Sequence, residues 1–215
     1  PELKRIRLGS LEPRIVTEEF TKRLSAIDKI CPHFHLSLQS GCDATLARMN
    51  RKYTTGQYDE CCQILRNYFE HPAITTDVIV GFPGETEAEF AETEKFLEHI
   101  AFAEMHIFKY SKREGTRAAA MEQQVDEGTK NVRSARLLAL NERLHDDFIR
   151  QWSGKPVEVL LEEAVQIDGR EHMTGHTKEY IRVAMELPEE MANTIVQGRI
   201  SLKLNEDFVI CKRID

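Results

Sequence analysis

Hydrophobic and polar positions follow two different periods along the first part of the chain. A nearly continuous run of apolar and β-branched residues at 74–80 has the composition of a strand buried on both faces. Segments with apolar residues at alternate or clustered positions at 5–9, 33–38 and 105–109 predict three more strands. Between these runs, apolar residues recur every three to four positions, which is typical of helices with one buried face. Strands that alternate with helices at this spacing predict a parallel α/β sheet with right-handed crossovers.

Three helix starts can be placed from capping residues. Thr17 precedes a helix with apolar residues at i, i+4 and i+7, and a short helix is expected after residue 43. Thr54 with Gln57, and Thr86 with Glu89, have the spacing of a capping box. The second box predicts a helix over 87–100.

The pattern changes after residue 125. One long helix is predicted over 126–152, and Gly154-Lys155-Pro156 ends it. Its inward positions are expected to be Leu137, Leu140, Leu144 and Phe148, and its solvent positions Arg133, Arg136, Arg143 and Arg150. Short strands then follow at 157–161, 180–185, 200–204 and 208–211, with a turn at Asp168-Gly169, and together they predict a small closed or nearly closed β-barrel. The predicted domains are therefore 1–153 and 154–215.

Composition limits the class of protein. The chain has 215 residues, is 41% hydrophobic and carries a net charge of -7, so it can bury a core but is not a simple polycation for nucleic acid. No apolar run is long enough to span a membrane, and we expect no membrane partner. The five cysteines form no CxxC pair, which suits a reducing cytoplasm and predicts buried structural thiols.

The segment 75–86 combines a strand, a glycine turn and a helix cap. Gly81 and Gly84 permit positive φ or close backbone approach. Polar residues at the ends of successive parallel strands converge on one mouth, where ligands bind in such sheets. The candidates are Ser10, Glu12, Ser37, Gln39, Asp77 and Ser111, with Arg51 as a bidentate partner for a carboxylate. Each of them also has a structural interpretation, as a helix cap, a backbone-bonding group or a surface charge.

Four ordered segments, 33–43, 49–54, 76–86 and 110–116, resemble the radical S-adenosylmethionine methylthiotransferases, and 175–183 resembles the TRAM domain that ends those proteins. The resemblance implies part of a TIM-like (β/α) radical-SAM barrel followed by a small OB-like barrel. The residues at 36–43 and 50–52 are most similar to those of the MtaB type, which methylthiolates threonylcarbamoyladenosine beside the tRNA anticodon. The sister types act on isopentenyladenosine in tRNA or on a ribosomal protein.

The same resemblance implies that the whole enzyme uses two kinds of cofactor, S-adenosylmethionine and a pair of [4Fe-4S] clusters. It also implies tRNA as the partner. By position, Gln39 and Asp77 would contact the ribose hydroxyls, Arg51 the methionine carboxylate, and Ser10 or Glu12 the amino group. The glycines of the 81–84 turn would admit the nucleoside. Residues 154–215 contain eight Lys and Arg against twelve Asp and Glu, so RNA contact would require a local patch. The candidates for that patch are Lys155, Arg182, Arg199, Lys212 and Arg213.

The chain lacks the CxxxCxxC triplet that holds the radical cluster in this family. It also begins at Pro1, with Ile6 to Leu8 already resembling a strand. We therefore expect a C-terminal fragment separated from its N-terminal domains, with no metal ligand set, no bound cluster and no turnover of its own.

Two alternatives remain from other classes. One is a non-catalytic RNA-binding module built on a degenerate barrel. The other is a different barrel enzyme that uses Glu12, Asp77 or His35 as acid or base. The histidines near the barrel mouth are expected to have no evident partner, which disfavours the second alternative.

Overall fold

The computed structural model describes residues 3–188 and 191–214. The chain divides into two compact units, residues 1–145 and 146–215. The division between residues 145 and 146 falls inside the helix over 127–152, whereas the boundary predicted from the sequence, at residue 153, falls just after that helix. The proposed domain boundary at 153 and the contact boundary therefore differ, because one helix contributes its two ends to different units.

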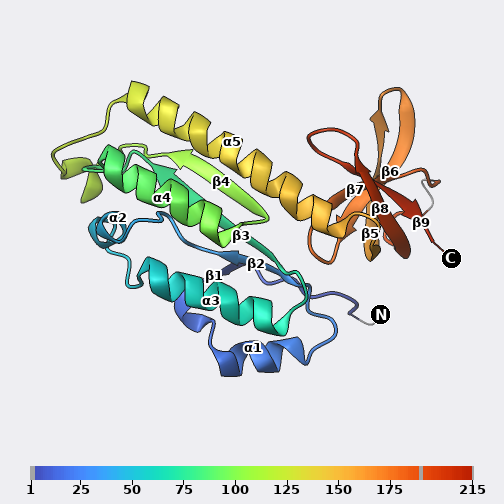
Figure 1. The fold of residues 1–215 in the computed structure, drawn as a ribbon. Helices are drawn as coiled ribbons and strands as arrows, with labels where there is room; N and C mark the ends of the chain where they lie inside the picture. The colour runs from blue at the N-terminus through green and yellow to red at the C-terminus, as the bar shows by residue number, and fades with distance from the viewer. Residues whose placement is uncertain (1–2, 189–190, 215) are drawn as a thin grey trace. The chain divides into compact units, whose positions relative to one another are not determined.

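The first unit is built on four parallel strands in the order β1-β2-β3-β4 (Figure 1). They are β1 (Ser10–Leu11), β2 (His33–Leu36), β3 (Ala73–Val80) and β4 (Glu104–Lys109). The predicted strand at 5–9 is wrong: this segment makes one isolated bridge, from Ile6 to Ile30. Regular pairing starts only at Ser10, because the segment opposite Ile6 is a loop that precedes β2.

Helices α1 (Glu18–Ser25), α2 (Asp43–Arg48), α3 (Thr55–Tyr68) and α4 (Glu87–Ile100) connect the strands, with a 3-10 turn at Pro13–Ile15. The predicted caps are confirmed. The Thr17 hydroxyl accepts from the Phe20 N–H, and both capping boxes are complete. These reciprocal bonds satisfy backbone groups that would otherwise lack partners at the helix starts.

The two faces of the sheet differ in cover. Phe34, Leu36, Ile74 and Val78 are almost fully buried in the core that α3 and α4 share with the sheet. The alternate residues point to the other face, which is partly open: His35, Asp77 and Ile79 are half-buried and Phe108 is exposed. Side chains on this open face are the ones available for a ligand.

Helix α5 (Glu127–Trp152) follows a 3-10 turn at Ala118–Ala120. The predicted inward residues Leu137, Leu140, Leu144 and Phe148 are all buried. The prediction that Arg133 faces solvent is wrong, since this residue is 4% exposed. Arg133 lies four positions before Leu137, so it occupies the same stripe as the leucines.

The second unit is a closed five-stranded barrel, as predicted, in the order β5-β6-β7-β9-β8. Its strands are β5 (Pro156–Ile167), β6 (Arg170–Thr177), β7 (Arg182–Met185), β8 (Ile195–Lys203) and β9 (Val209–Arg213). The sequence pattern missed β6 and the second half of β5, which form one long hairpin around Asp168-Gly169. Tyr180 does not begin β7, because its φ of +72° takes it out of extended conformation.

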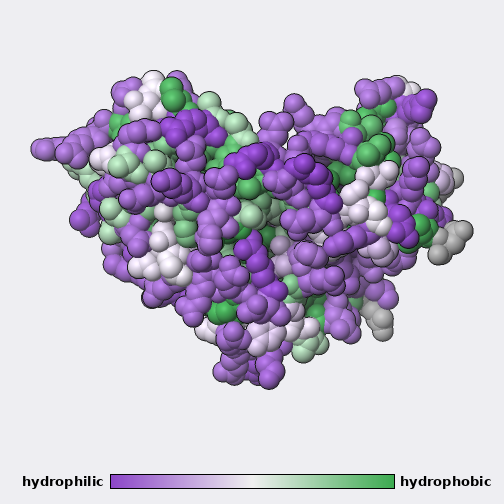
Figure 2. Space-filling model, in the orientation of Figure 1, coloured by the Kyte–Doolittle hydropathy of each residue, from purple (hydrophilic) through white to green (hydrophobic). Residues whose placement is uncertain are grey.

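The face seen in Figure 2 is mainly hydrophilic, and its hydrophobic residues form small separate patches. Within the described residues, none of the helices combines the length and the apolar character that crossing a bilayer requires.

Candidate functional site

One cleft on the open face of the sheet brings together three of the predicted site residues. It has a volume of about 510 Å³. Gln39 and Ser111 line it just after β2 and β4, and Asp77 lines it from within β3. Ile79, Phe108 and Tyr110 supply apolar and aromatic lining. An amide, a carboxylate and a hydroxyl around an apolar wall suit a ligand that carries both a ring and hydroxyl groups.

Gln39 is held in place by the backbone of β3. Its N–H donates to Asp77 O at 2.9 Å, and its C=O accepts from the Ile79 N–H at 2.9 Å. This pairing continues the sheet past the end of β2 while Gln39 itself has a φ of +76°. A non-glycine residue in this region is uncommon, and here two strand hydrogen bonds fix it beside Asp77.

The other predicted polar residues form a second group that does not line the cleft. The hydroxyls of Ser10 and Ser37 lie 3.0 Å apart on β1 and just after β2. Glu12 and Arg51 both act electrostatically on Tyr53, whose pKa is raised to about 12, chiefly by burial. The Tyr53 hydroxyl donates to the carbonyl oxygens that follow β2. Arg51 is thus placed near the β1 and β2 edge of the sheet rather than at the cleft.

The glycine turn has the expected backbone. Gly81 and Gly84 have φ of +73° and +80°. The close approach at Gly81 is made by the protein itself, because an added Cβ would lie 2.2 Å from Lys130 Cγ. The Gly81 N–H donates to Glu85 Oε1 at 3.0 Å, so this amide is already engaged. Contact between this turn and a nucleoside stays a prediction.

A buried ion pair anchors that turn to α5. Arg133 Nη1 lies 2.7 Å from Glu85 Oε1, and the two side chains are only 5% and 2% exposed. Arg133 also donates to Glu85 O at 3.1 Å. Burial raises the pKa of Glu85, while the Gly81 N–H and the Arg133 guanidinium act in the opposite direction. The sequence pattern did not predict this pair. The four-residue spacing of Arg133 and Leu137 is a signal for the burial of Arg133, but it does not identify Glu85 as the partner.

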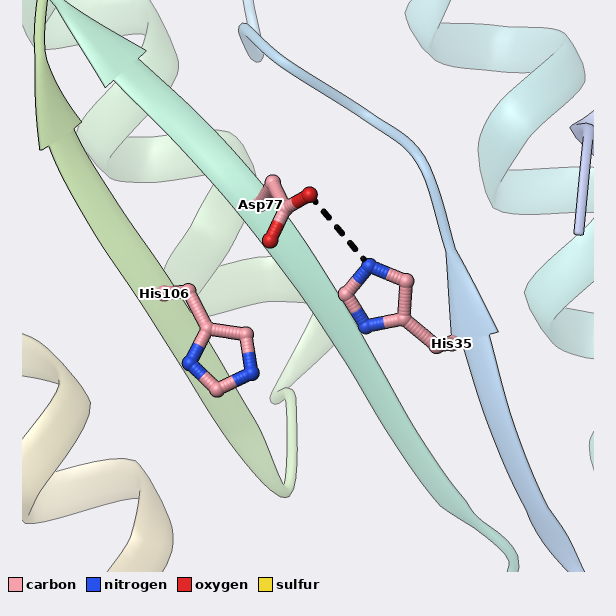
Figure 3. A group of neighbouring side chains, drawn as sticks. All are labelled: His35, Asp77 and His106. Atoms are coloured by element: carbon pink, nitrogen blue, oxygen red, sulfur yellow. Dashed lines mark ion pairs between the residues drawn. The ribbon is translucent and has the colours of Figure 1, made fainter. Parts of the chain in front are cut away.

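Two histidines lie next to Asp77 on the same open face of the sheet. His35, Asp77 and His106 each offer a ligand atom, and these atoms lie within 4.8 Å of one another. His35 Nε2 is 3.5 Å from Asp77 Oδ2, and Figure 3 shows the carboxylate of Asp77 between the two rings. The expectation that these histidines have no partner is therefore wrong. The pairing of Asp77 with His106 depends on strand register, which no sequence pattern gave.

The cysteines do not fit an iron–sulfur cluster. All five are free and buried, and none belongs to a group of three metal-ligating residues in the described part of the chain. Burial is the leading cause that raises the pKa of Cys42, and it raises that of Cys61 and of Cys211 to about 11. Because a cluster needs thiolates, burial that raises the pKa of Cys42, Cys61 and Cys211 makes these three thiols poor cluster ligands.

Three of the five basic candidates in the barrel come together. Arg199 and Lys212 are direct partners across β8 and β9, and Arg199 also pairs with Pro156, next to Lys155. Arg182 lies on β7, with its guanidinium 4.3 Å from the centre of the Phe208 ring. Lys155 is half-buried, and the other four candidates are exposed: Arg182, Arg199, Lys212 and Arg213.

Comparison with known proteins gives a consistent result. Residues 2–97 match the family described as the Radical SAM superfamily. Over 199 residues the chain is 43% identical to "Threonylcarbamoyladenosine tRNA methylthiotransferase MtaB" of Bacillus subtilis (strain 168), covering 92% of this chain and 44% of that protein. It is 40% identical to "tRNA-2-methylthio-N(6)-dimethylallyladenosine synthase" of Thermoanaerobacter sp. (strain X514), covering 82% of this chain and 37% of that protein.

A similar fold occurs in coproporphyrinogen III oxidase (HemN) from Escherichia coli, described as a radical SAM enzyme. The TM-score is 0.56 at 16% identity, over 65% of this chain and 32% of that one. The chain spans less than half the length of these relatives.

Proposed function

We propose that this chain, which belongs to the radical SAM methylthiotransferase family, is the S-adenosylmethionine-binding and tRNA-contacting part of an enzyme that methylthiolates threonylcarbamoyladenosine. The observation that carries the proposal is the convergence of Gln39, Asp77 and Ser111 in one cleft on the open face of the sheet. The proposed substrate is tRNA next to the anticodon, and the proposed compartment is the cytoplasm.

The cleft suits the nucleoside end of the cofactor. Gln39, just after β2, and Asp77, within the neighbouring β3, present an amide and a carboxylate, and these groups can bind the two ribose hydroxyls. Phe108 and Tyr110 offer aromatic surface for the adenine ring. When bound, the cofactor supplies radical chemistry and a methyl group, while the protein orients it and limits access of water.

The second polar group is proposed to hold the methionine end. Arg51 provides a guanidinium for the carboxylate, and Ser10 or Glu12 accepts from the amino group. Ser37 keeps Ser10 in place through the hydroxyl contact at 3.0 Å. The two [4Fe-4S] clusters of the whole enzyme are proposed to be held outside this chain, because its cysteines are buried and none joins a group of three metal ligands among the described residues.

The barrel is proposed to contribute part of the tRNA contact through Lys155, Arg199 and Lys212. These three cations are neighbours through strand pairing, since Arg199 lies opposite Lys212 on β9 and opposite Pro156, which follows Lys155; the segment as a whole is acidic. Such a patch attracts phosphate locally and adds to affinity without reading sequence.

Nucleoside mass spectrometry of tRNA from cells without the parent gene tests the proposal. Loss of the methylthio form of threonylcarbamoyladenosine, and its return when the gene is restored, is the expected result. The name of the second relative makes a methylthiolated dimethylallyladenosine the competing product. Loss of that nucleoside instead would refute the proposed substrate, and an unchanged set of tRNA nucleosides would refute the proposed activity.

A further inference from the structure

We propose that His35, Asp77 and His106 form a binding site for one divalent transition-metal ion. Two imidazoles and one carboxylate are a donor set that suits first-row ions such as Fe²⁺, Co²⁺ and Zn²⁺. The three residues come from three neighbouring strands, β2, β3 and β4, and their ligand atoms lie within 4.8 Å of one another. The site shares Asp77 with the cleft proposed above for S-adenosylmethionine, but its test uses the metal ion alone and needs no methylthiotransferase activity.

Strand register produces this grouping. Asp77 is the direct partner of His106, and His35 is the direct partner of Thr75, two positions before Asp77. Side chains two positions apart on a strand lie on the same face, so all three ligands project from the open face of the sheet. A sheet is a rigid support, which favours a preformed ligand group over one that must assemble on loops.

The orientation of His35 also supports metal binding. Its Nδ1 lies 3.1 Å from Thr75 Oγ1, and its Nε2 is directed at Asp77 (Figure 3). A histidine that bonds through one ring nitrogen to the protein and presents the other is the usual arrangement in metal sites. If Nδ1–H donates to Thr75, the Nε2 lone pair faces a carboxylate oxygen, and a cation between them removes that repulsion.

The distances require a small adjustment. In a tetrahedral site with ligand bonds of about 2.05 Å, donor atoms are about 3.3 Å apart. The His35 and Asp77 atoms, at 3.5 Å, already meet this spacing. His106 is exposed and its ring centre lies 5.9 Å from that of His35, so rotation of a free side chain can close the rest. Three protein ligands leave at least one position for water or another ligand.

Zinc binding to the metal-free 215-residue chain tests the site. Equilibrium dialysis with elemental analysis should find one Zn²⁺ per chain. His106→Ala should weaken binding by at least about 100-fold, because loss of a second-shell partner alone costs 10–100-fold. His106→Asp restores a ligand and should recover much of the affinity. His99→Ala removes a surface histidine that pairs with Asp59 at 3.1 Å, outside the proposed site, and should leave binding unchanged.

Cobalt distinguishes this site from the cysteines. Co²⁺ bound to His35, Asp77 and His106 should give weak visible bands without thiolate charge transfer. Thr75→Val, which removes only the hydroxyl, should weaken Co²⁺ binding by about 10–100-fold. Circular dichroism of each variant establishes that it is folded. The proposal fails if the wild-type chain binds neither ion, if His106→Ala binds as tightly as wild type, or if thiolate bands dominate.

Discussion

Replacing Arg133 with methionine should destabilise the first unit far more than the same change at Arg136. The two arginines lie one turn apart on α5, and both guanidinium groups lie over the Phe90 ring, at 5.3 and 4.7 Å. They differ in burial: the Arg133 and Glu85 side chains are 5% and 2% exposed, whereas Arg136 is 40% exposed in its pairs with Glu87 and Glu94.

The expected magnitudes follow from that difference. Removing one partner of a buried ion pair costs about 3–5 kcal/mol, because the remaining charge stays in a poorly solvated site. Removing one partner of an exposed pair costs about 1 kcal/mol or less. The free energy of unfolding of Arg133→Met should therefore fall about 2–5 kcal/mol below that of Arg136→Met. Urea titration followed by far-ultraviolet circular dichroism measures both, and the fluorescence of the single tryptophan, Trp152, follows the barrel unit separately.

The deficit of Arg133→Met should also depend on pH. Burial already raises the pKa of Glu85, and the variant loses the guanidinium that lowers it. A carboxyl whose pKa is higher in the folded than in the unfolded state stabilises the fold when protonated and destabilises it as pH rises through the folded pKa. The deficit should be largest at alkaline pH and should shrink as pH falls through the raised folded-state pKa of Glu85, because the carboxyl then becomes neutral. Equal losses in the two variants, or a deficit that does not shrink on acidification, would refute the reasoning.

Three further predictions concern the cleft, the barrel and the glycine turn. Asp77→Asn should weaken binding of S-adenosylmethionine to the full-length enzyme by about 10-fold or more, because a charged acceptor to ribose is lost; equilibrium dialysis that finds unchanged affinity would remove Asp77 from the proposed site. Lys212→Gln should lower the slope of tRNA affinity against salt concentration by about one phosphate contact. Arg170→Gln, at the start of β6 and away from the proposed patch, should leave that slope unchanged. Equal slopes for the two variants would argue against the basic patch. Gly81→Ala should lower the free energy of unfolding by about 2–5 kcal/mol, because strain at positive φ adds to overpacking against Lys130. Gly115→Ala, at φ +79° with nothing within 4 Å of the added Cβ, should lower it by only about 1–2 kcal/mol. Similar losses for the two variants in urea titration would contradict the packing at Gly81.

Local sequence signals predicted most of the elements. Both capping boxes, helix α4 and the leucine stripe of α5 were confirmed, because each depends on residues within a few positions of one another. The hairpin of β5 and β6 was missed because two consecutive polar residues, Glu162 and Glu163, break the alternating pattern where the strand pairing is irregular. The strand predicted at 5–9 failed for the opposite reason: its pattern is suitable, but no regular strand lies opposite it.

The sequence alone determined the alternation of strands and helices, the presence of a second β-rich unit, and the similarity to radical SAM methylthiotransferases, through motifs that are contiguous in the chain. Only the tertiary structure decided which side chains meet. Arg133 is buried because α5 packs its leucine stripe against the first unit and brings the arginine to Glu85. Asp77 lies beside Gln39, His35 and His106 because parallel strands pair in one register. Register is a property of two strands together, so neither strand's sequence specifies it by itself.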